Sequence, residues 1–460
     1  MQYNFNIPKE GEFIINSLYE AGFEAYVVGG FIRDRILGLD VSDVDIATDA
    51  LPDYIERIFS DYKTIDVGKV FGTISIVIGE QTFEVTTFRI DGNYIDGRRP
   101  EKVEFSRTLK EDLRRRDFTI NAMAYNERVG LVDYFGGYRD LNESLLKTVG
   151  PAEKRISEDY LRMLRAIRFA AKYNLSISPK LSDSIRKHSK EIENISAERI
   201  SKELNKMLLG DRPSLAFDLL YDHGLLEYIF EDLYKAHGFD QMTIHHDLDV
   251  YGHTMKVLDN TPKDLDVRLA AIFHDLGKIY TRFIGEDGNG HFYGHEKVSE
   301  DICRRELKRL RYDGKTIDTV SALVNRHMDA MNPYTEKRVN RLVRKMGVEN
   351  LRKLFYLQKA DILATNNPEF AFKIDEATCI LDDIIEKNKV VFVNQIAIDG
   401  DDIIELGYKQ GKVIGLILNH ITELVADGEL INDRQIILKY IRERSYKDEE
   451  DNNCRFMFGT

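Results

Sequence analysis

Hydrophobic and polar positions follow two different patterns along this 460-residue chain. Before about residue 145, apolar runs of strand length alternate with short helical patterns, and two β-rich runs, 73–78 and 82–89, flank a Gly-Glu turn that is typical of a hairpin. From residue 157 onward, helical periodicity continues almost to the end. The pattern therefore predicts an α+β chain, with a small mixed sheet first and helices after it.

A pair of aspartates follows a pair of glycines within the predicted sheet region. In VVGGFIRDRILGLDVSDVDIATD, Gly29 and Gly30 end a buried strand, and Asp43 and Asp45 lie on the next one. Residues i and i+2 of a strand point to one face, so both carboxylates can bind hard cations there. Two Mg²⁺ ions so held would activate an attacking hydroxyl and stabilise a pyrophosphate leaving group. Glu84 either adds a third carboxylate or only braces the sheet.

Composition and charge narrow the class of protein. The chain is 43% hydrophobic and 31% charged, without a run long and apolar enough to cross a bilayer and without an N-terminal export signal. Its three cysteines, Cys303, Cys379 and Cys454, are too far apart for a zinc knuckle, and they fit a reducing cytoplasm. A net charge of −13 excludes a surface coated with phosphate-binding groups, so any RNA site must be local. The richest basic stretch is 98–116.

Four further motifs follow the aspartate pair. They are RRRDFTINAMA at 114–124, DYFGGYRDL at 133–141, EDYLRMLRAIRFAA at 158–171 and SAERISKEL at 196–204. With the glycine and aspartate segment, they resemble the successive motifs of class II CCA-adding enzymes and bacterial poly(A) polymerases, which have a polymerase-β-like nucleotidyltransferase head. The resemblance covers about the first half of the chain. It implies that an RNA 3′-hydroxyl attacks the α-phosphate of CTP or ATP without a nucleic-acid template, with Mg²⁺ on Asp43 and Asp45.

The resemblance also assigns the nucleotide site. It implies that Asp159 and Arg162 contact the Watson–Crick edge of the incoming base, in place of a template strand. The other nucleotide-binding residues that it implies are Gly30, Arg33, Arg116, Asp117, Asn121, Arg165 and Arg168. On one helix, residues 158, 162 and 165 would share a face, although a salt-bridged surface is the commoner fate of such residues. Glu198 and Arg199 are expected to brace neighbouring helices.

The segment 89–105 is rich in glycine and charge, and we expect it to be mobile. It resembles the flexible loop of CCA-adding and A-adding enzymes, which implies that the chain adds the terminal A. The segment VGKVFGTISIVI at 67–78 resembles the CCA-adding version, which implies tRNA as the substrate. Two alternatives within the same fold remain open: an enzyme that adds only A to tRNA, and a poly(A) polymerase. A third, from another class, is a metal phosphohydrolase with a degenerate head.

Histidines and aspartates in the second half form another pattern. It comprises His253, His274-Asp275, His295, His327 and Asp361. This pattern resembles an HD domain, whose first metal set would be His253, His274, Asp275 and Asp361. Imidazole and carboxylate ligands suit a divalent transition metal that activates water. A buried His-Asp pair is more often only a satisfied hydrogen bond, and an inactive HD scaffold that helps to hold tRNA is the competing account.

These patterns predict four domains. They are a nucleotidyltransferase head at 1–145, a helical neck for nucleotide and RNA at 146–235, an HD metal-binding domain at 236–365, and a helical C-terminal region with an acidic tail at 366–460. The expected partners are tRNA, CTP and ATP, with no membrane contact. No sequence feature predicts an oligomeric state.

Overall fold

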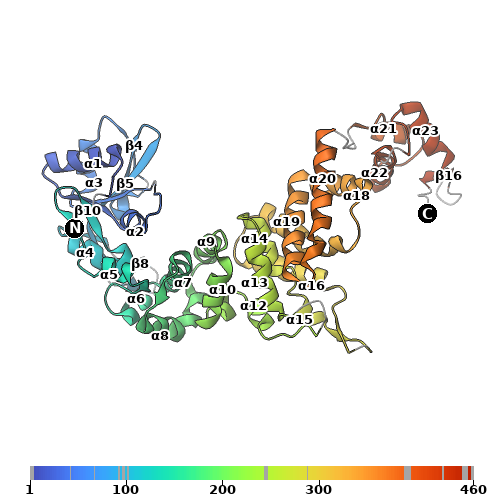
Figure 1. Ribbon diagram of the computed structural model, residues 1–460. Helices are drawn as coiled ribbons and strands as arrows, with labels where there is room; N and C mark the ends of the chain where they lie inside the picture. Colours follow the sequence, from blue (N-terminus) through green and yellow to red (C-terminus); the bar gives the residue numbers. More distant parts are fainter. Residues whose placement is uncertain are drawn as a thin grey trace. The chain divides into compact units, whose positions relative to one another are not determined.

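The computed structural model describes residues 5–41, 43–66, 68–91, 94–95, 99–100, 103–242, 247–286, 288–387, 395–426, 429–447 and 454–456 (Figure 1). Its internal contacts divide the chain into two compact units. The first is Met1–Lys235 with Lys308–Tyr312, and the second is Ala236–Leu307 with Asp313–Thr460. The finer division into four domains stays a prediction.

The first unit begins with a mixed seven-stranded sheet in the order β11-β10-β1-β2-β5-β4-β3. The strands are β1 (Ala25–Val28), β2 (Asp45–Thr48), β3 (Lys63–Ile65), β4 (Thr73–Ile78), β5 (Gln81–Thr87), β10 (Ala124–Asn126) and β11 (Gly130–Val132). β2 and β5 are parallel, and the other neighbours are antiparallel. The predicted hairpin is β4–β5, and the predicted mixed sheet at the start of an α+β chain is confirmed.

Helices cover this sheet because their apolar residues recur on one side. α1 (Lys9–Glu20) buries Ile14 and Leu18 and packs against β1 and β2, while α3 (Pro52–Ile58) packs beside it on β4 and β5. α2 (Gly30–Ile36) follows β1 directly and contacts it. α4 (Leu109–Arg114) and α5 (Gly137–Asn142) complete this part (Figure 1). The strand β1 and helix α2 thus bring the glycine pair to the end of a buried strand.

The segment expected to be mobile contains short paired strands. β6 (Arg89–Asp91) pairs with β9 (Val103–Phe105), and β7 (Tyr94–Ile95) pairs with β8 (Arg99–Pro100). Its remaining residues, 92–93, 96–98 and 101–102, lie outside the described part of the chain. The mobility of the segment therefore stays a prediction.

Helices follow the sheet for the rest of the first unit. They are α6 (Ala152–Glu158), α7 (Leu161–Tyr173), α8 (Pro179–His188), α9 (Ala197–Leu208), α10 (Pro213–Asp222) and α11 (Leu226–Ile229), with the short strands β12 (Leu145–Leu146) and β13 (Ser176–Ile177) between them. One expectation was wrong: residues 158–171 do not form a single helix. α6 ends at Glu158, and Asp159 is extended with a φ of −153°. The Asp159 carboxylate accepts the backbone N–H of Leu161, a local bond that competes with helix continuation.

The second unit is built mainly of helices. They are α13 (Val250–Asn260), α14 (Leu265–Phe273), α15 (Lys278–Thr281), α16 (His295–Arg309), α17 (Gly314–Arg326), α18 (Glu336–Met346), α19 (Val348–Ala364) and α20 (Phe372–Glu386), and α12 (Glu231–Ala236) crosses the boundary. A short hairpin, β14 (Phe283–Ile284) with β15 (Gly290–His291), precedes α16. α14 is strongly apolar, is buried from Val267 to Phe273 and packs on α13, α17 and α19. In the described residues, no helix is long and apolar enough to cross a membrane.

The end of the second unit has a small core of its own. α21 (Gly400–Glu405), α22 (Lys412–Ala426) and α23 (Arg434–Glu443) surround a cluster of buried isoleucines that includes Ile403, Ile417 and Ile437. Two strands, β16 (Ser445–Lys447) and β17 (Cys454–Phe456), add a short ladder that the helical expectation lacked. Residues 448–453 of the predicted acidic tail lie outside the described residues.

Candidate active site and metal centre

A pocket of about 530 Å³ opens in the first unit, between elements of the sheet and helices α7 and α9. Its lining includes the predicted residues Gly30, Arg33, Asp45, Arg116, Asp117, Asn121, Asp159, Arg162 and Arg165. It also includes residues without a predicted role there, namely Gly29, Arg89, Arg115, Leu161, Phe169 and Arg199. Seven arginines face three aspartates in this lining, which makes a local positive site in an acidic chain, suited to a triphosphate.

Gly29 joins the end of β1 to the first turn of α2. Its φ is +70°, a conformation that side chains with a Cβ rarely adopt. A Cβ added there would lie 2.7 Å from Nη1 of Arg116, which lines the pocket. Glycine at this position therefore allows both the turn and the close approach of the arginine.

The two aspartates of the predicted pair are both exposed, while Val44 and Ile46 beside them are buried, as the strand alternation predicts. Asp45 begins β2 and lies next to Glu84 of β5 in the parallel register, whereas Asp43 precedes the strand and is not part of the pocket lining. Among the residues that the structure describes, neither carboxylate forms a hydrogen bond or an ion pair, so both remain available to a cation.

The electrostatics of Asp45 favour a bound cation. Desolvation raises its pKa to about 6; Arg116 opposes this rise, and the nearby charges of Asp43 and Glu84 add to it. Carboxylate oxygens are the ligands that Mg²⁺ prefers in proteins. A magnesium ion at Asp45 would relieve the repulsion from the charges of Asp43 and Glu84.

A continuous chain of polar contacts crosses the floor of the pocket. Nη1 of Arg33 donates to Oδ1 of Asn121, and Nδ2 of Asn121 donates to Oδ1 of Asp117 at 3.0 Å. Arg165 donates to Oδ2 of Asp117 from Nε at 2.8 Å and from Nη2 at 2.5 Å. Burial alone would raise the pKa of Asp117, but Arg165 and Asn121 outweigh it and lower that pKa to about 2. These four predicted residues form one rigid network.

The predicted base-reading pair is held by two different partners. Nη1 of Arg162 donates to Oε2 of Glu158 at 2.6 Å and to the carbonyl of Arg155 at 2.8 Å. Asp159 does not pair with Arg162; its Oδ2 accepts a hydrogen bond from Nη2 of Arg199 at 2.7 Å. Arg199, which we expected only to brace helices, therefore has a place in the pocket as well. The signal for it was the motif at 196–204, but a local pattern cannot show that α9 brings this side chain to Asp159.

Arg168 lies beside the pocket rather than in its lining. Its Nε donates to Oε2 of Glu203 on α9 at 2.6 Å, and its guanidinium lies 4.2 Å from the ring centre of Phe169. Arg33 and Arg165 contact the same ring, at 5.2 and 5.4 Å. Phe169 thus organises three of the predicted arginines, a role that the sequence pattern did not indicate.

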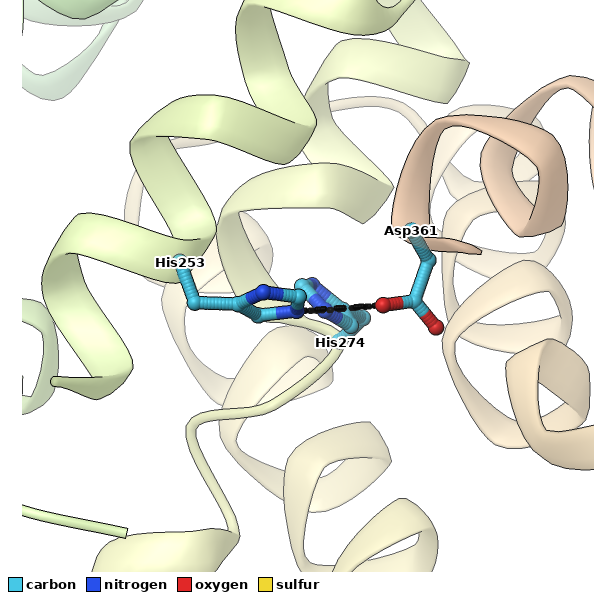
Figure 2. A group of neighbouring side chains, drawn as sticks. All are labelled: His253, His274 and Asp361. Atoms are coloured by element: carbon cyan, nitrogen blue, oxygen red, sulfur yellow. Dashed lines mark hydrogen bonds and ion pairs between the residues drawn. The ribbon is translucent and has the colours of Figure 1, made fainter. Parts of the chain in front are cut away.

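All six residues of the histidine and aspartate pattern meet inside the second unit. His253 comes from α13, His274 follows α14, and Asp361 comes from α19, so three helices deliver one cluster (Figure 2). Nε2 of His253 lies 3.0 Å from Oδ1 of Asp361 and 3.4 Å from Nε2 of His274. A second cluster contains Asp275, His295 and His327, with 3.2 Å between the two imidazole Nε2 atoms.

Asp275 joins the two clusters. Its Oδ2 lies 3.5 Å from Nε2 of His253 and 3.3 Å from that of His274. Its Oδ1 lies 3.3 Å from Nε2 of His295 and 3.6 Å from that of His327. One carboxylate therefore faces both sets of imidazoles, an arrangement that suits a bridging ligand between two cations.

Hydrogen bonds determine which imidazole nitrogen faces the centre. Nδ1 of His274 lies 2.8 Å from the carbonyl of Ala271, and Nδ1 of His295 and of His327 each lie 2.7 Å from a backbone carbonyl. A carbonyl only accepts, so Nδ1 donates in each of these contacts and Nε2 is the ring nitrogen that faces the centre. This orienting bond is typical of metal-binding histidines.

Three family profiles match the chain in order. They are "Poly A polymerase head domain" at residues 25–147, "Probable RNA and SrmB- binding site of polymerase A" at 174–236, and "HD domain" at 243–366. The match to the HD profile covers the histidine and aspartate clusters just described. The match to the head profile covers the aspartate pair and the glycine turn.

Relatives of similar length share the whole organisation. The CCA-adding enzyme of Ligilactobacillus salivarius is 31% identical over 444 residues, covering 94% of this chain and 96% of that protein. The CCA-adding enzyme of Geobacillus stearothermophilus is 32% identical over 442 residues, covering 96% and 98%. The crystal structure of the Bacillus stearothermophilus CCA-adding enzyme in complex with CTP superposes with a TM-score of 0.74 at 28% identity, over 95% of this chain and 97% of that one. The chain belongs to the CCA-adding enzyme family.

Proposed function

We propose that this chain adds C and A nucleotides to the 3′ end of tRNA from CTP and ATP and releases pyrophosphate. The observation that carries the proposal is the arginine-lined pocket that brings Asp45 together with Asp159 and Arg162. Nucleotide transfer without a template requires a carboxylate that can bind a metal and polar side chains that can contact the edge of a base. Full-length relatives named CCA-adding enzymes, one of them solved with CTP, support the same conclusion.

The residues divide the work by position. Asp43 and Asp45 would hold Mg²⁺, which neutralises triphosphate charge and lowers the pKa of the attacking 3′-hydroxyl when it is bound there. Arg33, Arg116 and Arg165 line the pocket and would bind phosphate oxygens or the base through charge-assisted hydrogen bonds. Gly30 starts α2, so its backbone N–H lies where a phosphate can approach. Asp117 and Asn121 hold the arginines and contribute to ribose binding.

Base selection follows from donor and acceptor chemistry. Cytosine and adenine both carry an exocyclic amino group beside an unprotonated ring nitrogen, and Asp159 accepts from the former while Arg162 donates to the latter. Uracil presents a carbonyl oxygen and a ring N–H in these places, so both contacts fail. The side chains thus act as a template that admits C and A. We propose the cytoplasm as the place of action, consistent with Cys303 and Cys379, which are free thiols in the described structure.

An incorporation assay tests this function. The purified chain is given tRNA ending at the discriminator base, at C, or at CC, each with CTP and ATP, and product lengths are read on a sequencing gel. We expect additions of three, two and one nucleotides; extension only of the CC-ending tRNA by one A would indicate an A-adding enzyme, and long A tails would indicate a poly(A) polymerase.

A carboxylate variant tests the site in the same assay. Asp45→Ala should abolish every addition, because it removes a carboxylate from the pocket. Asp53→Ala is the matched control, since Asp53 is an exposed carboxylate of the same sheet domain paired with Lys69. Full incorporation by Asp45→Ala would contradict the assignment.

A second candidate activity is favoured by the histidine Nε2 atoms that face one another beside two carboxylates in the second unit. We propose that His253, His274, Asp275 and Asp361 bind a divalent transition metal, that His295 and His327 extend the site, and that the centre hydrolyses a phosphoester such as a 2′,3′-cyclic phosphate at an RNA end. The imidazole-rich donor set fits such a metal better than magnesium.

Metal analysis and hydrolysis assays test this second activity. His274→Ala should lose bound metal and cyclic-phosphate hydrolysis while keeping tRNA extension. His420→Ala, which removes an imidazole from the separate C-terminal helices, should change neither. An unchanged metal content in His274→Ala would refute the ligand set. If the wild type incorporated no nucleotide and His274→Ala removed the only activity, the chain would be a phosphohydrolase alone.

A further inference from the structure

Asp159 cannot be oriented by a helix. It lies between the end of α6 and the start of α7, and its own backbone is extended rather than helical. A carboxylate at such a position rotates unless other groups hold it. The Asp159 side chain is nevertheless mostly buried, and 18% of its surface is exposed. Its orientation therefore depends on the groups that contact its two oxygens.

Those contacts come from one backbone group and one distant arginine. Oδ1 accepts the N–H of Leu161 at 3.1 Å, and Oδ2 accepts Nη2 of Arg199 at 2.7 Å. Each carboxylate oxygen has two lone-pair directions, so one direction on each oxygen remains for a ligand. Arg199 is separated from Asp159 by 40 residues and lies on α9, which packs on α7. The packing of these two helices thus sets the direction of the carboxylate.

Arg199 also carries a donor that protein groups do not satisfy. Within the described residues its Nη1 is hidden from solvent and has no hydrogen-bond partner. A hidden donor without an acceptor costs stability. A side chain selected only to brace two helices would not need to line the pocket or bear this cost; the Arg168–Glu203 ion pair joins the same helices outside the lining.

We propose that Arg199 is the positioning residue for base selection: its ion pair holds the Asp159 carboxylate toward the amino group of the incoming base. The proposal rests on the proposed nucleotidyl transfer and names a determinant of its specificity. A held carboxylate accepts the amino group of cytosine or adenine and repels the carbonyl oxygen of uracil. A carboxylate released from Arg199 turns away, so the contact with CTP weakens and the repulsion of UTP weakens too.

The test measures selectivity in the full-length enzyme. Arg199→Met keeps the length of the side chain and removes the charge, and Arg199→Lys keeps the charge with a single contact. With tRNA ending at C, we expect Arg199→Met to lower kcat/KM for CTP about tenfold, mainly through KM, and to lower the CTP-to-UTP ratio of kcat/KM by about the same factor. Arg199→Lys should recover part of the kcat/KM for CTP and part of the CTP-to-UTP ratio. Lys206→Met, an exposed cation on the same helix, should match the wild type.

A double-mutant cycle with Asp159→Asn separates positioning from bracing. If Arg199 acts through Asp159, the double variant should have a kcat/KM for CTP that is less than about twofold below that of Asp159→Asn alone. Fully additive losses, or a lower melting temperature of Arg199→Met with an unchanged CTP-to-UTP ratio, would overturn the proposal. If Arg199→Met does not fold, the CTP-to-UTP ratio of Arg199→Lys decides alone, and an unchanged ratio overturns it. A wild type that adds neither C nor A refutes the proposed function itself.

Discussion

The ammonium group of Lys278 lies 2.7 Å from Oδ2 of Asp275, the same oxygen that faces the imidazoles of His253 and His274. Nζ of Lys278 also donates to Oε1 of Gln241 at 2.8 Å, and the lysine is buried. A metal ion at the proposed centre would therefore compete with this protein cation for one carboxylate oxygen. We expect the competition to lower the affinity of the centre for metal.

Lys278→Met should tighten metal binding. Without the ammonium, Asp275 loses a buried counter-charge that a divalent ion at the proposed centre would replace. We expect binding of Mn²⁺ or Ni²⁺ to be about tenfold tighter, which adds about 1.4 kcal/mol of metal-induced stabilisation at saturating metal. Calorimetric titration, and melting curves with and without metal, check this. Lys297→Met, an exposed lysine of α16, is the control. An equal or weaker affinity in Lys278→Met would contradict the competition.

Gly29→Ala should disable the nucleotide pocket. Gly29 and Gly38 have nearly the same positive φ, +70° and +71°, but only a Cβ at Gly29 would meet Arg116. Alanine at a positive φ is strained by about 1–3 kcal/mol, and the ψ of −114° at Gly29 lies outside the left-handed helical region. Because only Gly29→Ala displaces Arg116, we expect a loss of CTP affinity in that variant and near-normal affinity in Gly38→Ala. Equilibrium binding of CTP measures the difference, and equal affinities would show that the approach of Arg116 is unimportant.

Glu158→Gln should weaken the contact that orients Arg162. Oε2 of Glu158 accepts from Nη1 of Arg155 at 2.7 Å and from Nη1 of Arg162 at 2.6 Å, so one carboxylate holds two arginines. A neutral amide removes that charge, and we expect kcat/KM for both CTP and ATP to fall about tenfold. Glu153→Gln on the same helix, whose partners Lys187 and His188 lie away from the pocket, is the matched control. Equal kinetics of the two variants would argue against a role for Glu158.

The Asp117–Arg165 pair should make the first unit sensitive to acid. Although burial opposes it, Arg165 lowers the pKa of Asp117 from 3.8 to about 2. A lowered folded-state pKa contributes stability that is present above the unfolded pKa, near pH 4, and is lost as the pH falls toward 2; the shift corresponds to about 2 kcal/mol. Arg165→Met should therefore melt well below the wild type at pH 7, with the gap narrowing between pH 4 and pH 2.

Thermal unfolding followed by circular dichroism across this pH range measures the difference in melting temperature between the wild type and Arg165→Met. Arg139→Met is the control, because Arg139 is 71% exposed and its loss should shift the melting temperature little at any pH. A gap between the wild type and Arg165→Met that stays constant from pH 7 to pH 2 would show that the ionisation of Asp117 is not responsible.

Local features of the site were predictable because they depend on neighbours in the chain. Asp43 and Asp45 are exposed and Val44 is buried as expected, but the prediction that both aspartates lie on one strand was wrong, because β2 begins only at Asp45. The need for glycine at position 29 follows from a turn. The helix over 158–171 failed for a local reason as well, because the Asp159 side chain competes for a backbone N–H that periodicity does not register.

The sequence by itself determined the class of the chain, the order of its motifs, and the chemistry available at each position: carboxylates for magnesium, arginines for phosphate, imidazoles for a transition metal. Only the tertiary structure decided which of these side chains meet. The pairing of Arg199 with Asp159 spans 40 residues, and that of His253 with Asp361 spans 108. Such contacts arise because packed helices bring distant segments together, and the periodicity of one segment carries no information about its partner.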